Sequence, residues 1–548
     1  MKMKKLVSRI MAFALTMIMI LGMSMSALAA STVTINGTKE NGNVQAFKLF
    51  DRTQNKSGTA VAYTLNEEYA EYFTQTGKAG AGKSGDALSA AAYEYVAGLS
   101  GEDKKDDLSQ FAADMWAWLS ANGKEADATV AAGSKTTTMS LEAGYYLVFP
   151  AGASVLNGVA KSPAMLMDVD GTAAVNATLK SEYPTVEKKV KTTADGNAEA
   201  AGTVKPGDEI TYTITSKVPD VSGYNKGYKF VINDELSEGL TFKALTSVKI
   251  GDNDLAEANY VLTNPVDENA QKLTVELKNM ATGTVGSMTP NIAVYPVGAT
   301  IILTYTVTVN DKAVTGINPN TNKASVTYSN DPSTDGTGTS EEVHADVYTF
   351  GFDIFKYTLT DNAQADAESN RTALAGAQFK LYAANGDTKG NEISLVADGN
   401  GVYRQAKDAT EELTKVEYIE TDAKGRLTVK GLKDGTYFLT ETKAPDGFNK
   451  LVGDIKVEIN KLQYAADDAT KLESYEVVYT IPGADTSTTV IVNATDATAE
   501  IPVRNNAGAM LPSTGGNGGI VFTVVGVAII GFMMLNDLRS KKRKKEAK

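Results

Sequence analysis

The sequence predicts a mainly β protein in which an α+β domain is followed by tandem β-sandwich domains. Long stretches alternate apolar and polar residues with a period of two, as do strands of a sheet with one buried face. Glycine, proline, asparagine and aspartate separate these stretches as turns. More than 450 residues lie between two removable ends, which is too many for one core and enough for about three domains.

The first 30 residues are typical of a secretory signal. Basic residues precede an apolar stretch over 10–23, and the small-residue pattern Ala27, Leu28, Ala29 follows. We expect cleavage after Ala29 or Ala30. The signal peptide, residues 1–30, therefore lies outside the fold.

Residues 31–182 predict the α+β domain. Apolar residues recur at helical spacing over 108–119, and Gly123 follows as a stop signal. This is the only convincing helical region, and it holds both tryptophans, so we expect an amphipathic helix that faces the core rather than a ligand site. Alternation predicts strands at 32–35, 44–50, 144–148 and 175–179.

Residues 183–345 and 346–508 predict two β-sandwich domains. In the first of them, apolar residues alternate with threonine over 210–214 and 303–309. The second repeats the pattern in shorter strands, as at 377–381. Such alternation is expected where each sheet buries one face against the other.

Composition excludes several classes of function. A formal net charge of -13 argues against nucleic-acid binding, which needs a basic surface. With 0 Cys, the exported domains cannot be stabilised by disulfides. The single histidine, His344, excludes a multi-histidine metal site, and no hydrolase constellation surrounds it. We therefore expect a protein that is not an enzyme and has no cofactor, and we assign no metal site.

Each sandwich has three polar residues at positions that the alternation assigns to its core. Phe352, Ile354 and Lys356, for example, share one face of a strand. Salt-bridged residues at a sheet edge are the alternative explanation, but the same combination of lysine, carboxylate and asparagine occurs twice. The two trios are Lys188, Asp234 and Asn322 in the middle domain, and Lys356, Glu441 and Asn505 in the third.

Burial gives such a trio a specific chemistry. An unpaired buried charge costs several kcal/mol, so burial favours the neutral lysine amine and the protonated acid. The neutral amine is a nucleophile, and the acid can polarise the asparagine carbonyl and pass protons. Attack on the amide carbon with loss of ammonia would leave a Lys–Asn isopeptide bond across the sandwich. Closing a loop of over a hundred residues in this way would contribute about 5 kcal/mol.

Residues 432–448 resemble the E box of Gram-positive pilins and of related collagen-adhesin B-type domains. Residues 184–188, 233–240 and 322–328 are similar to the second domain of pilus backbone subunits. The resemblance implies tandem immunoglobulin-like (collagen-adhesin A/B-type) sandwiches. The residues that match the E box are Leu432, Gly435, Tyr437, Leu439, Glu441, Ala444, Pro445, Gly447 and Phe448.

The resemblance also implies which residues react. Lys189 and Asn506 are the alternatives, and they are disfavoured because the alternation places them on the face away from the core. In the first domain the strand at 144–150 resembles the E-box strand, but Pro150 takes the place of the glutamate, so we expect no bond there. The implied bonds run from Lys188 to Asn322 with Asp234 assisting, and from Lys356 to Asn505 with Glu441 assisting.

Residues 509–548 resemble the cell-wall sorting signal of Gram-positive surface proteins. An apolar run over 520–535 and a basic end follow an LPxTG pentapeptide. We expect the run to be a transmembrane segment that holds the secreted chain in the membrane until a sortase cleaves between Thr and Gly and anchors it to the cell wall. A plain single-pass anchor is the alternative. The pentapeptide is Leu511, Pro512, Ser513, Thr514 and Gly515.

Pilus backbone subunits carry a polymerising lysine in a Tyr-Pro-Lys motif before the second domain. Here Tyr183 and Pro184 are followed by Thr185, so this lysine is missing. We predict Lys180 as the substitute, because it lies on the polar face of the preceding strand. Lys161 and Lys189 are the alternatives.

The leading hypothesis is the major, or shaft, subunit of a sortase-assembled fimbria, a covalent pilus that supports adhesion. The alternative is a wall-anchored adhesin or minor pilin that is not polymerised, whose first domain binds a host or polysaccharide ligand. The partners implied are a class C sortase, a housekeeping sortase, other copies of the chain, minor pilins and peptidoglycan.

Overall fold

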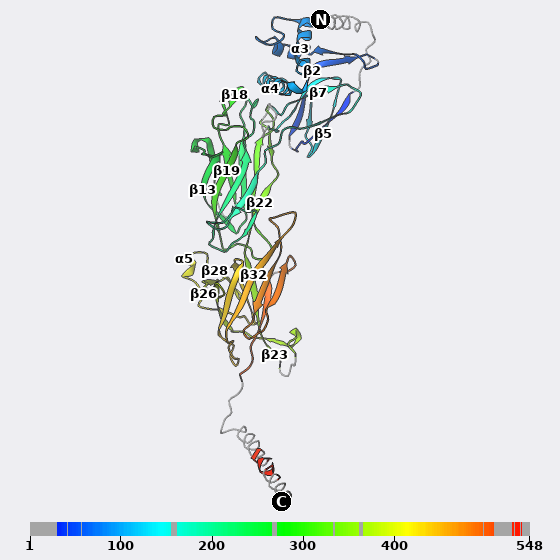
Figure 1. The fold of residues 1–548 in the computed structure, drawn as a ribbon. Helices are drawn as coiled ribbons and strands as arrows, with labels where there is room; N and C mark the ends of the chain where they lie inside the picture. Colours follow the sequence, from blue (N-terminus) through cyan, green and yellow to red (C-terminus); the bar gives the residue numbers. More distant parts are fainter. Residues whose placement is uncertain are drawn as a thin grey trace.

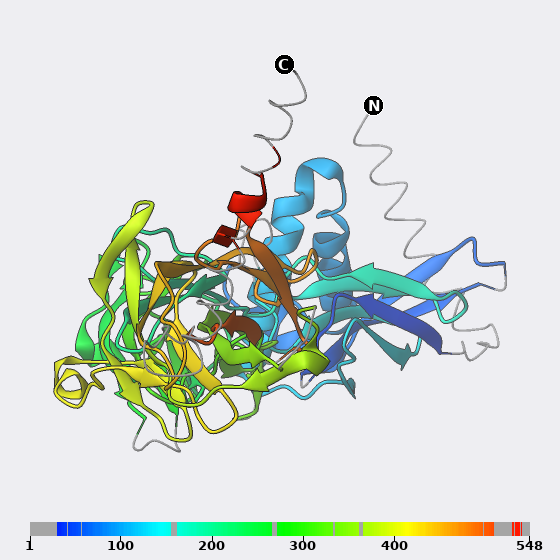
Figure 2. The same cartoon turned by 90° about the horizontal axis from the view of Figure 1, so that it is seen from below.

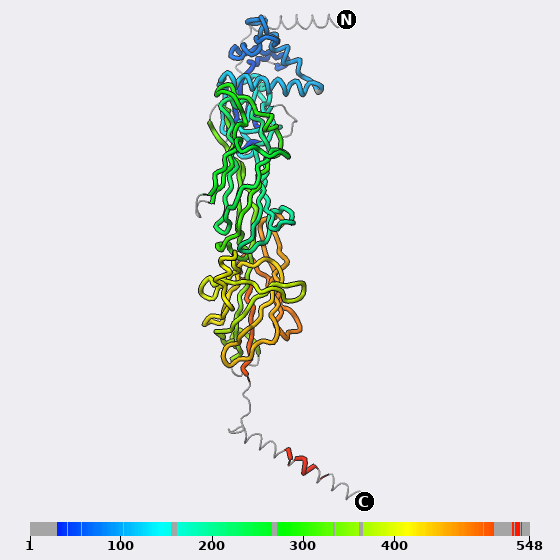
Figure 3. Tube along the Cα trace, turned by 90° about the vertical axis from the view of Figure 1, so that its left-hand side faces the viewer, coloured from blue at the N-terminus to red at the C-terminus, as the bar shows by residue number. Residues whose placement is uncertain are grey.

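The computed structural model describes residues 30–508, apart from 41, 56, 155–161, 266–270, 333–334, 361–364 and 497, together with 529–530, 532–536 and 539. The described chain forms an elongated column of three bodies stacked end to end (Figures 1 and 3). Strands dominate the middle and third bodies, and the first body combines strands with helices, so the mainly β prediction with tandem domains is confirmed. The signal peptide up to Ala29 and the LPxTG pentapeptide lie outside the described residues.

The first body combines two antiparallel-rich sheets with helices. One sheet has the order β5-β1-β8, and the other has the order β3-β2-β6-β7 with β4 paired to β2. The helices gather on one side of these sheets, as the view along the column shows (Figure 2). Its strands are β1 (Ser31–Asn36), β2 (Asn43–Gln54), β3 (Val61–Leu65), β4 (Ala128–Ala131), β5 (Thr136–Leu141), β6 (Gly144–Pro150), β7 (Met165–Val169) and β8 (Val175–Thr178). Its helices are η1 (Glu67–Tyr69), α2 (Ala70–Thr74), α3 (Gly85–Ala97), η2 (Glu102–Lys104) and α4 (Lys105–Ala121).

Helix α4 covers the segment predicted to be helical. It buries one stripe that includes Phe111, Met115 and Trp116. Trp116 stacks on Phe149 of β6 with ring centroids 3.6 Å apart, which explains the tryptophan as core packing. The claim that this was the only convincing helix is wrong, because α3 also forms. Its buried residues are few and small apart from Leu88, so it shows no strong helical stripe in the sequence.

The middle body is a sandwich of two sheets. The larger has the order β10-β22-β20-β12-β16-β15 with β21 paired to β20, and it faces the sheet β14-β13-β19-β11-β9. Alternate residues of β11 and β19 are buried, as their sequence alternation predicts. The elements are β9 (Glu187–Lys191), β10 (Ala201–Thr203), β11 (Glu209–Lys217), β12 (Phe230–Leu236), β13 (Leu240–Ile250), β14 (Asn253–Asp254), η3 (Glu257–Asn259), β15 (Tyr260–Thr263), β16 (Lys272–Leu277), β17 (Ala281–Thr284), β18 (Ser287–Pro290), β19 (Thr300–Val309), β20 (Asn320–Ser329), β21 (Thr337–Thr339) and β22 (Val343–Tyr348).

The third body repeats this architecture. One sheet has the order β24-β23-β30-β28-β27, with β35 joining β23 in parallel, and the other has the order β26-β25-β31-β32-β33-β34, with β29 paired to β25. The elements are β23 (Phe350–Leu359), η4 (Glu368–Asn370), β24 (Arg371–Ala373), β25 (Gln378–Asn385), β26 (Thr388–Glu392), β27 (Leu395–Ala397), β28 (Val402–Gln405), α5 (Ala409–Glu412), β29 (Ile419–Glu420), β30 (Arg426–Leu432), β31 (Gly435–Lys443), β32 (Asp454–Tyr464), β33 (Leu472–Thr480), β34 (Thr488–Asn493) and β35 (Ala499–Arg504).

The prediction of a transmembrane segment is wrong for the chain as the structure describes it. No helix among the described residues is both long enough and apolar enough to cross a membrane. Of the apolar run, the structure describes short helical pieces at 529–530 and 532–536. A membrane span needs about 20 consecutive apolar residues in one helix.

Candidate functional site

The third body brings Lys356, Glu441 and Asn505 into contact inside its core. Each of the three is at most 1% exposed. Lys356 Nζ donates a hydrogen bond to Asn505 Oδ1 and lies 3.0 Å from Glu441 Oε1. Asn505 Nδ2 donates to the same Glu441 oxygen at 3.1 Å. One carboxylate oxygen therefore touches both the amine and the amide nitrogen.

Local structure holds each member of this trio in place. Lys356 lies on β23, and Asn505 directly follows β35, where its backbone N–H donates to the Tyr357 carbonyl at 2.9 Å. Glu441 reaches in from β31 of the opposite sheet. Its other oxygen accepts a hydrogen bond from the Leu451 backbone at 2.6 Å, which fixes the carboxylate plane.

Burial in this site favours the reactive form of the lysine. Desolvation lowers the pKa of Lys356 from 10.5 to about 8, although the neighbouring Glu441 carboxylate acts in the opposite direction. The Phe379 ring lies 5.6 Å from the ammonium nitrogen and keeps water away on that side. Burial therefore shifts this lysine toward the neutral, nucleophilic amine.

The middle body brings together Lys188, Asp234 and Asn322, which are 5%, 3% and 0% exposed. Lys188 Nζ forms an ion pair with Asp234 Oδ2. Burial lowers the pKa of Lys188 and raises that of Asp234, while the attraction between them opposes both shifts. The structure thus places a lysine, a carboxylate and an asparagine together in both sandwiches.

A fourth residue, Tyr305 on β19, completes the middle site, and sequence reasoning missed it. Its hydroxyl accepts hydrogen bonds from Lys188 Nζ at 2.7 Å and from Asn322 Nδ2 at 2.8 Å. It donates to Asp234 Oδ2 at 2.6 Å. The available signal was a tyrosine on the inward face of an otherwise aliphatic strand, since a buried hydroxyl needs a partner.

The two sites differ in which strands they connect. In the middle body, Lys188 belongs to the sheet of β9, and Asp234 and Asn322 belong to the facing sheet. In the third body, Lys356 lies on β23, and Asn505 directly follows β35, the parallel neighbour of β23 in the same sheet. The expectation of a bond across the sandwich therefore fits the middle body, whereas the third trio would join the first and last strands of its body.

The candidate polymerising lysines occupy different places. Lys180 is exposed and lies two residues beyond the end of β8. Lys189 is exposed on β9, on the opposite face from Lys188. Lys161 lies outside the described residues. A different question is whether the first body holds a similar trio. Pro150, at the end of β6, takes the place of the glutamate there. Lys48 of the neighbouring strand β2 is 15% exposed and pairs with surface carboxylates.

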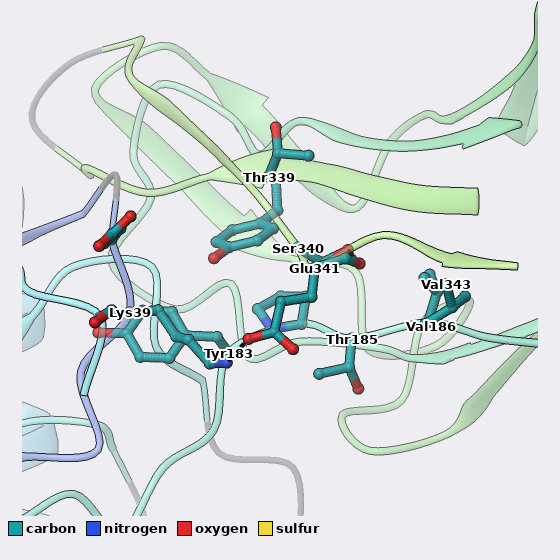
Figure 4. A pocket seen from close by; sticks show the side chains of 12 residues that line it. Lys39, Tyr183, Thr185, Val186, Thr339, Ser340, Glu341 and Val343 are labelled. Carbon is teal, nitrogen blue, oxygen red and sulfur yellow. Dashed lines mark hydrogen bonds and ion pairs between the residues drawn. The ribbon is translucent and has the colours of Figure 1, made fainter. Parts of the chain in front are cut away.

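A cavity of about 350 Å³ lies at the junction of the first and middle bodies (Figure 4). Tyr183, Pro184 and Thr185 line it, so the position where the motif lysine is missing faces this cavity. Lys39 also lines it, and its Nζ forms an ion pair of 2.5 Å with Glu341 Oε1. His344 is not among the lining residues, and its Nδ1 lies 3.2 Å from Asp346 Oδ2.

Comparison with known proteins gives these sites a context. Residues 364–471 match the SpaA prealbumin-like fold domain, and residues 504–548 match the LPXTG cell wall anchor motif. The fimbrial subunit type 1 of Actinomyces viscosus is 24% identical over 350 residues, which are 59% of this chain and 59% of that protein. In this respect the chain is similar to a fimbrial subunit. It is anchored to the cell wall at the surface through its LPXTG motif.

A second protein similar to this pilin-like chain is a surface protein. The trypsin-resistant surface T6 protein of Streptococcus pyogenes serotype M6 is 25% identical over 404 residues, covering 66% of this chain and 70% of that protein. The match to the Actinomyces protein covers less than two thirds of that protein's length.

Two solved structures align over most of the pilin-like chain. The T6 backbone pilin of S. pyogenes has 16% identity and a TM-score of 0.45, covering 89% of this chain and 100% of that one. The full-length major pilin SpaD of Corynebacterium diphtheriae has 18% identity and a TM-score of 0.41, covering 88% and 99%. Both TM-scores are below 0.5.

Proposed function

We propose that this chain is the structural shaft subunit of a covalently polymerised pilus, linked head to tail by sortase and stabilised by two internal Lys–Asn isopeptide bonds. The observation that carries the proposal is the enclosed contact of Lys356, Glu441 and Asn505. A buried lysine and carboxylate with no further role would be a costly way to hold a core together, because well-packed apolar residues often serve as well.

The chemistry balances without any cofactor. Glu441 takes a proton from the Lys356 ammonium, and the neutral amine attacks the Asn505 amide carbon. A new bond forms between that carbon and Nζ, and the bond from the carbon to Nδ2 breaks. Glu441 passes that proton to the departing nitrogen, which leaves as ammonia. It then takes up the second proton that the attacking nitrogen loses, so the side chain ends as the neutral carboxylic acid. The short contacts of Glu441 Oε1 with both nitrogens support this route.

Lys188, Asp234 and Asn322 would react in the same way in the middle body. The two bonds would replace the disulfides that a chain with 0 Cys cannot form. They would also resist reduction, since an amide has no redox chemistry. A surface fibre under tension would therefore keep its folded domains.

Polymerisation would use the sorting signal. A class C sortase would break the peptide bond between Thr514 and Gly515, hold Thr514 as a thioester, and pass it to the amine of Lys180 on another copy. A housekeeping sortase would join the last subunit to peptidoglycan, and minor pilins would complete the fibre. The LPXTG match and the exposure of Lys180 support this scheme.

One observation favours a second candidate function. Thr185 occupies the position of the motif lysine, and it lines a cavity between two bodies. A wall-anchored adhesin or minor pilin would need no polymerising lysine. Its first body would instead bind a host or polysaccharide ligand.

Cell-wall extracts boiled in detergent separate these candidates. The shaft subunit should give a ladder of covalent oligomers that collapses to one band when residues 511–515 are deleted. A single band from the wild type would overturn the polymer and favour the adhesin. Independently, the mass of the purified ectodomain should fall short of the sequence mass by two ammonia molecules. A wild-type mass with no deficit would overturn the isopeptide bonds.

A further inference from the structure

The middle and third sites differ in the group that touches the departing nitrogen. In the third body, Asn505 Nδ2 donates its hydrogen bond to the carboxylate oxygen of Glu441 at 3.1 Å. In the middle body, Asn322 Nδ2 donates its 2.8 Å hydrogen bond to the Tyr305 hydroxyl. The middle carboxylate is an aspartate, one methylene shorter than a glutamate, and the Tyr305 hydroxyl contacts both it and the amide nitrogen.

Tyr305 uses its full hydrogen-bonding capacity within this site. A phenol has one proton to donate and two lone pairs that can accept. The proton goes to Asp234 Oδ2 at 2.6 Å, and the lone pairs accept from Lys188 Nζ at 2.7 Å and Asn322 Nδ2 at 2.8 Å. The hydroxyl therefore touches the nucleophile, the acid and the leaving group at once.

The neighbouring Tyr212 shows that an aromatic ring alone does not explain this arrangement. Tyr212 stacks beside Tyr305 with ring centroids 5.7 Å apart, and its ring lies 5.0 Å from Lys188 Nζ. Its buried hydroxyl has no hydrogen-bond partner among the described residues. The two tyrosines thus share the packing role, and one of them alone forms the polar network.

We propose that Tyr305 is a catalytic residue for the middle isopeptide bond, carrying a proton between Asp234 and the departing nitrogen of Asn322. This inference rests on the proposed cross-link. Asp234 first takes a proton from the Lys188 ammonium, and the amine attacks the Asn322 amide carbon. As the bond from that carbon to Nδ2 breaks, Tyr305 gives its proton to Nδ2 and receives one from Asp234, and ammonia leaves. Asp234 then takes up the second proton that the attacking nitrogen loses, so Tyr305 is restored and Asp234 ends as the neutral acid.

The surroundings favour a coupled transfer over an ionised tyrosine. Burial raises the pKa of Tyr305 well above its ordinary value, and the adjacent Asp234 charge raises it further. A free phenolate would therefore be disfavoured. A hydroxyl that donates and accepts in the same step avoids that charge.

The test compares Tyr305→Phe with Tyr212→Phe in the full ectodomain, using peptide mapping to follow each cross-link over time. Loss of a general acid typically slows a reaction at least about 100-fold. We expect that slowing for the Lys188–Asn322 bond in Tyr305→Phe, and normal formation in Tyr212→Phe. The Lys356–Asn505 bond should form normally in both and shows that the third body has folded, and the Tyr212→Phe variant controls for loss of a buried hydroxyl in the middle body.

A double variant distinguishes proton transfer from packing. Asp234→Glu in the Tyr305→Phe background lengthens the acid toward the amide, as in the third body, and should restore the middle bond. If the double variant folds but stays unlinked, the relay is overturned in favour of a packing role. A middle bond that forms in Tyr305→Phe as fast as in Tyr212→Phe overturns the relay alone. A wild type that lacks the middle bond overturns the proposed function itself.

Discussion

Lys356 and Asn505 lie 149 residues apart in the chain, yet the amine of the first donates a hydrogen bond to the side-chain carbonyl of the second inside a closed core. Lys356 lies on β23, the first strand of the third body, and Asn505 directly follows β35, the last strand, which pairs with β23 in parallel. A covalent bond here would connect the entry and the exit of the body directly. Most of the following predictions depend on this contact.

Glu441→Gln should prevent the Lys356–Asn505 bond, because an amide cannot take the ammonium proton. The variant should keep one ammonia more than the wild type by intact mass. It should also lose about 5 kcal/mol of stability, the loop-closure contribution of such a cross-link. Glu458→Gln is the matched control, since Glu458 forms a surface ion pair with Lys456 on β32. An unchanged mass for Glu441→Gln would contradict the role of this carboxylate.

Asn505→Ala should change how the third body responds to force. In the wild type the load would pass from Lys356 to Asn505 through the bond, and the 149-residue loop would not extend. Without the bond, unfolding should release roughly 500 Å of chain at 3.3–3.6 Å per residue. Single-molecule pulling of the ectodomain measures this step. The same long step in wild-type molecules would show that no bond is present.

The pH dependence of stability should also differ between Asn505→Ala and the wild type. In the variant the amine still titrates, and burial lowers the folded pKa of Lys356 from 10.5 to about 8. Between these values the unfolded chain binds more protons than the folded one, so the free energy of unfolding should rise with pH. The slope from one such group is about 1.4 kcal/mol per pH unit. In the wild type the nitrogen would be an amide and would contribute no slope.

Pulse proteolysis in urea at pH 8, 9 and 10, followed by mapping of peptides from the third body, measures this difference. The comparison uses the difference between the two proteins, so other titrating groups largely cancel. Parallel stability curves would mean that Lys356 titrates equally in both chains. That result would argue against a bonded lysine in the wild type.

Lys180→Ala should abolish the covalent ladder while leaving both internal bonds intact by mass. The change removes an exposed amine beyond the end of β8 and should alter stability by less than about 0.5 kcal/mol. Lys189→Ala and Lys39→Ala serve as comparisons, since one is exposed on β9 and the other lines the junction cavity. A ladder that survives Lys180→Ala and disappears in one of these variants would reassign the polymerising lysine.

Much of the fold follows from local patterns. Period-two alternation marked β11 and β19, and helical spacing marked α4. Helix α3 was missed because its buried stripe is short and consists largely of small residues. Burial of one helix face produces the periodicity of apolar residues in the sequence. A helix that buries few large apolar residues therefore shows only a weak periodicity.

The candidate sites were also predicted only in part from the sequence. Alternation assigned Lys188 and Lys356 to the core, because the face of a strand on which a side chain lies depends on that strand alone. It could not reveal Tyr305, whose inward position matches that of any core aromatic. Its role depends on three polar atoms from three other strands.

The sequence by itself determined the tandem sandwiches, the sorting signal and the identity of the two buried trios, since each depends on residue types at short, regular spacing. Only the tertiary structure decided which strands the trios join: facing sheets in the middle body, and neighbouring parallel strands in the third. The reason is physical. Strand periodicity specifies the face of a residue, whereas the partner across that face is set by sheet order and register, which depend on contacts between distant parts of the chain.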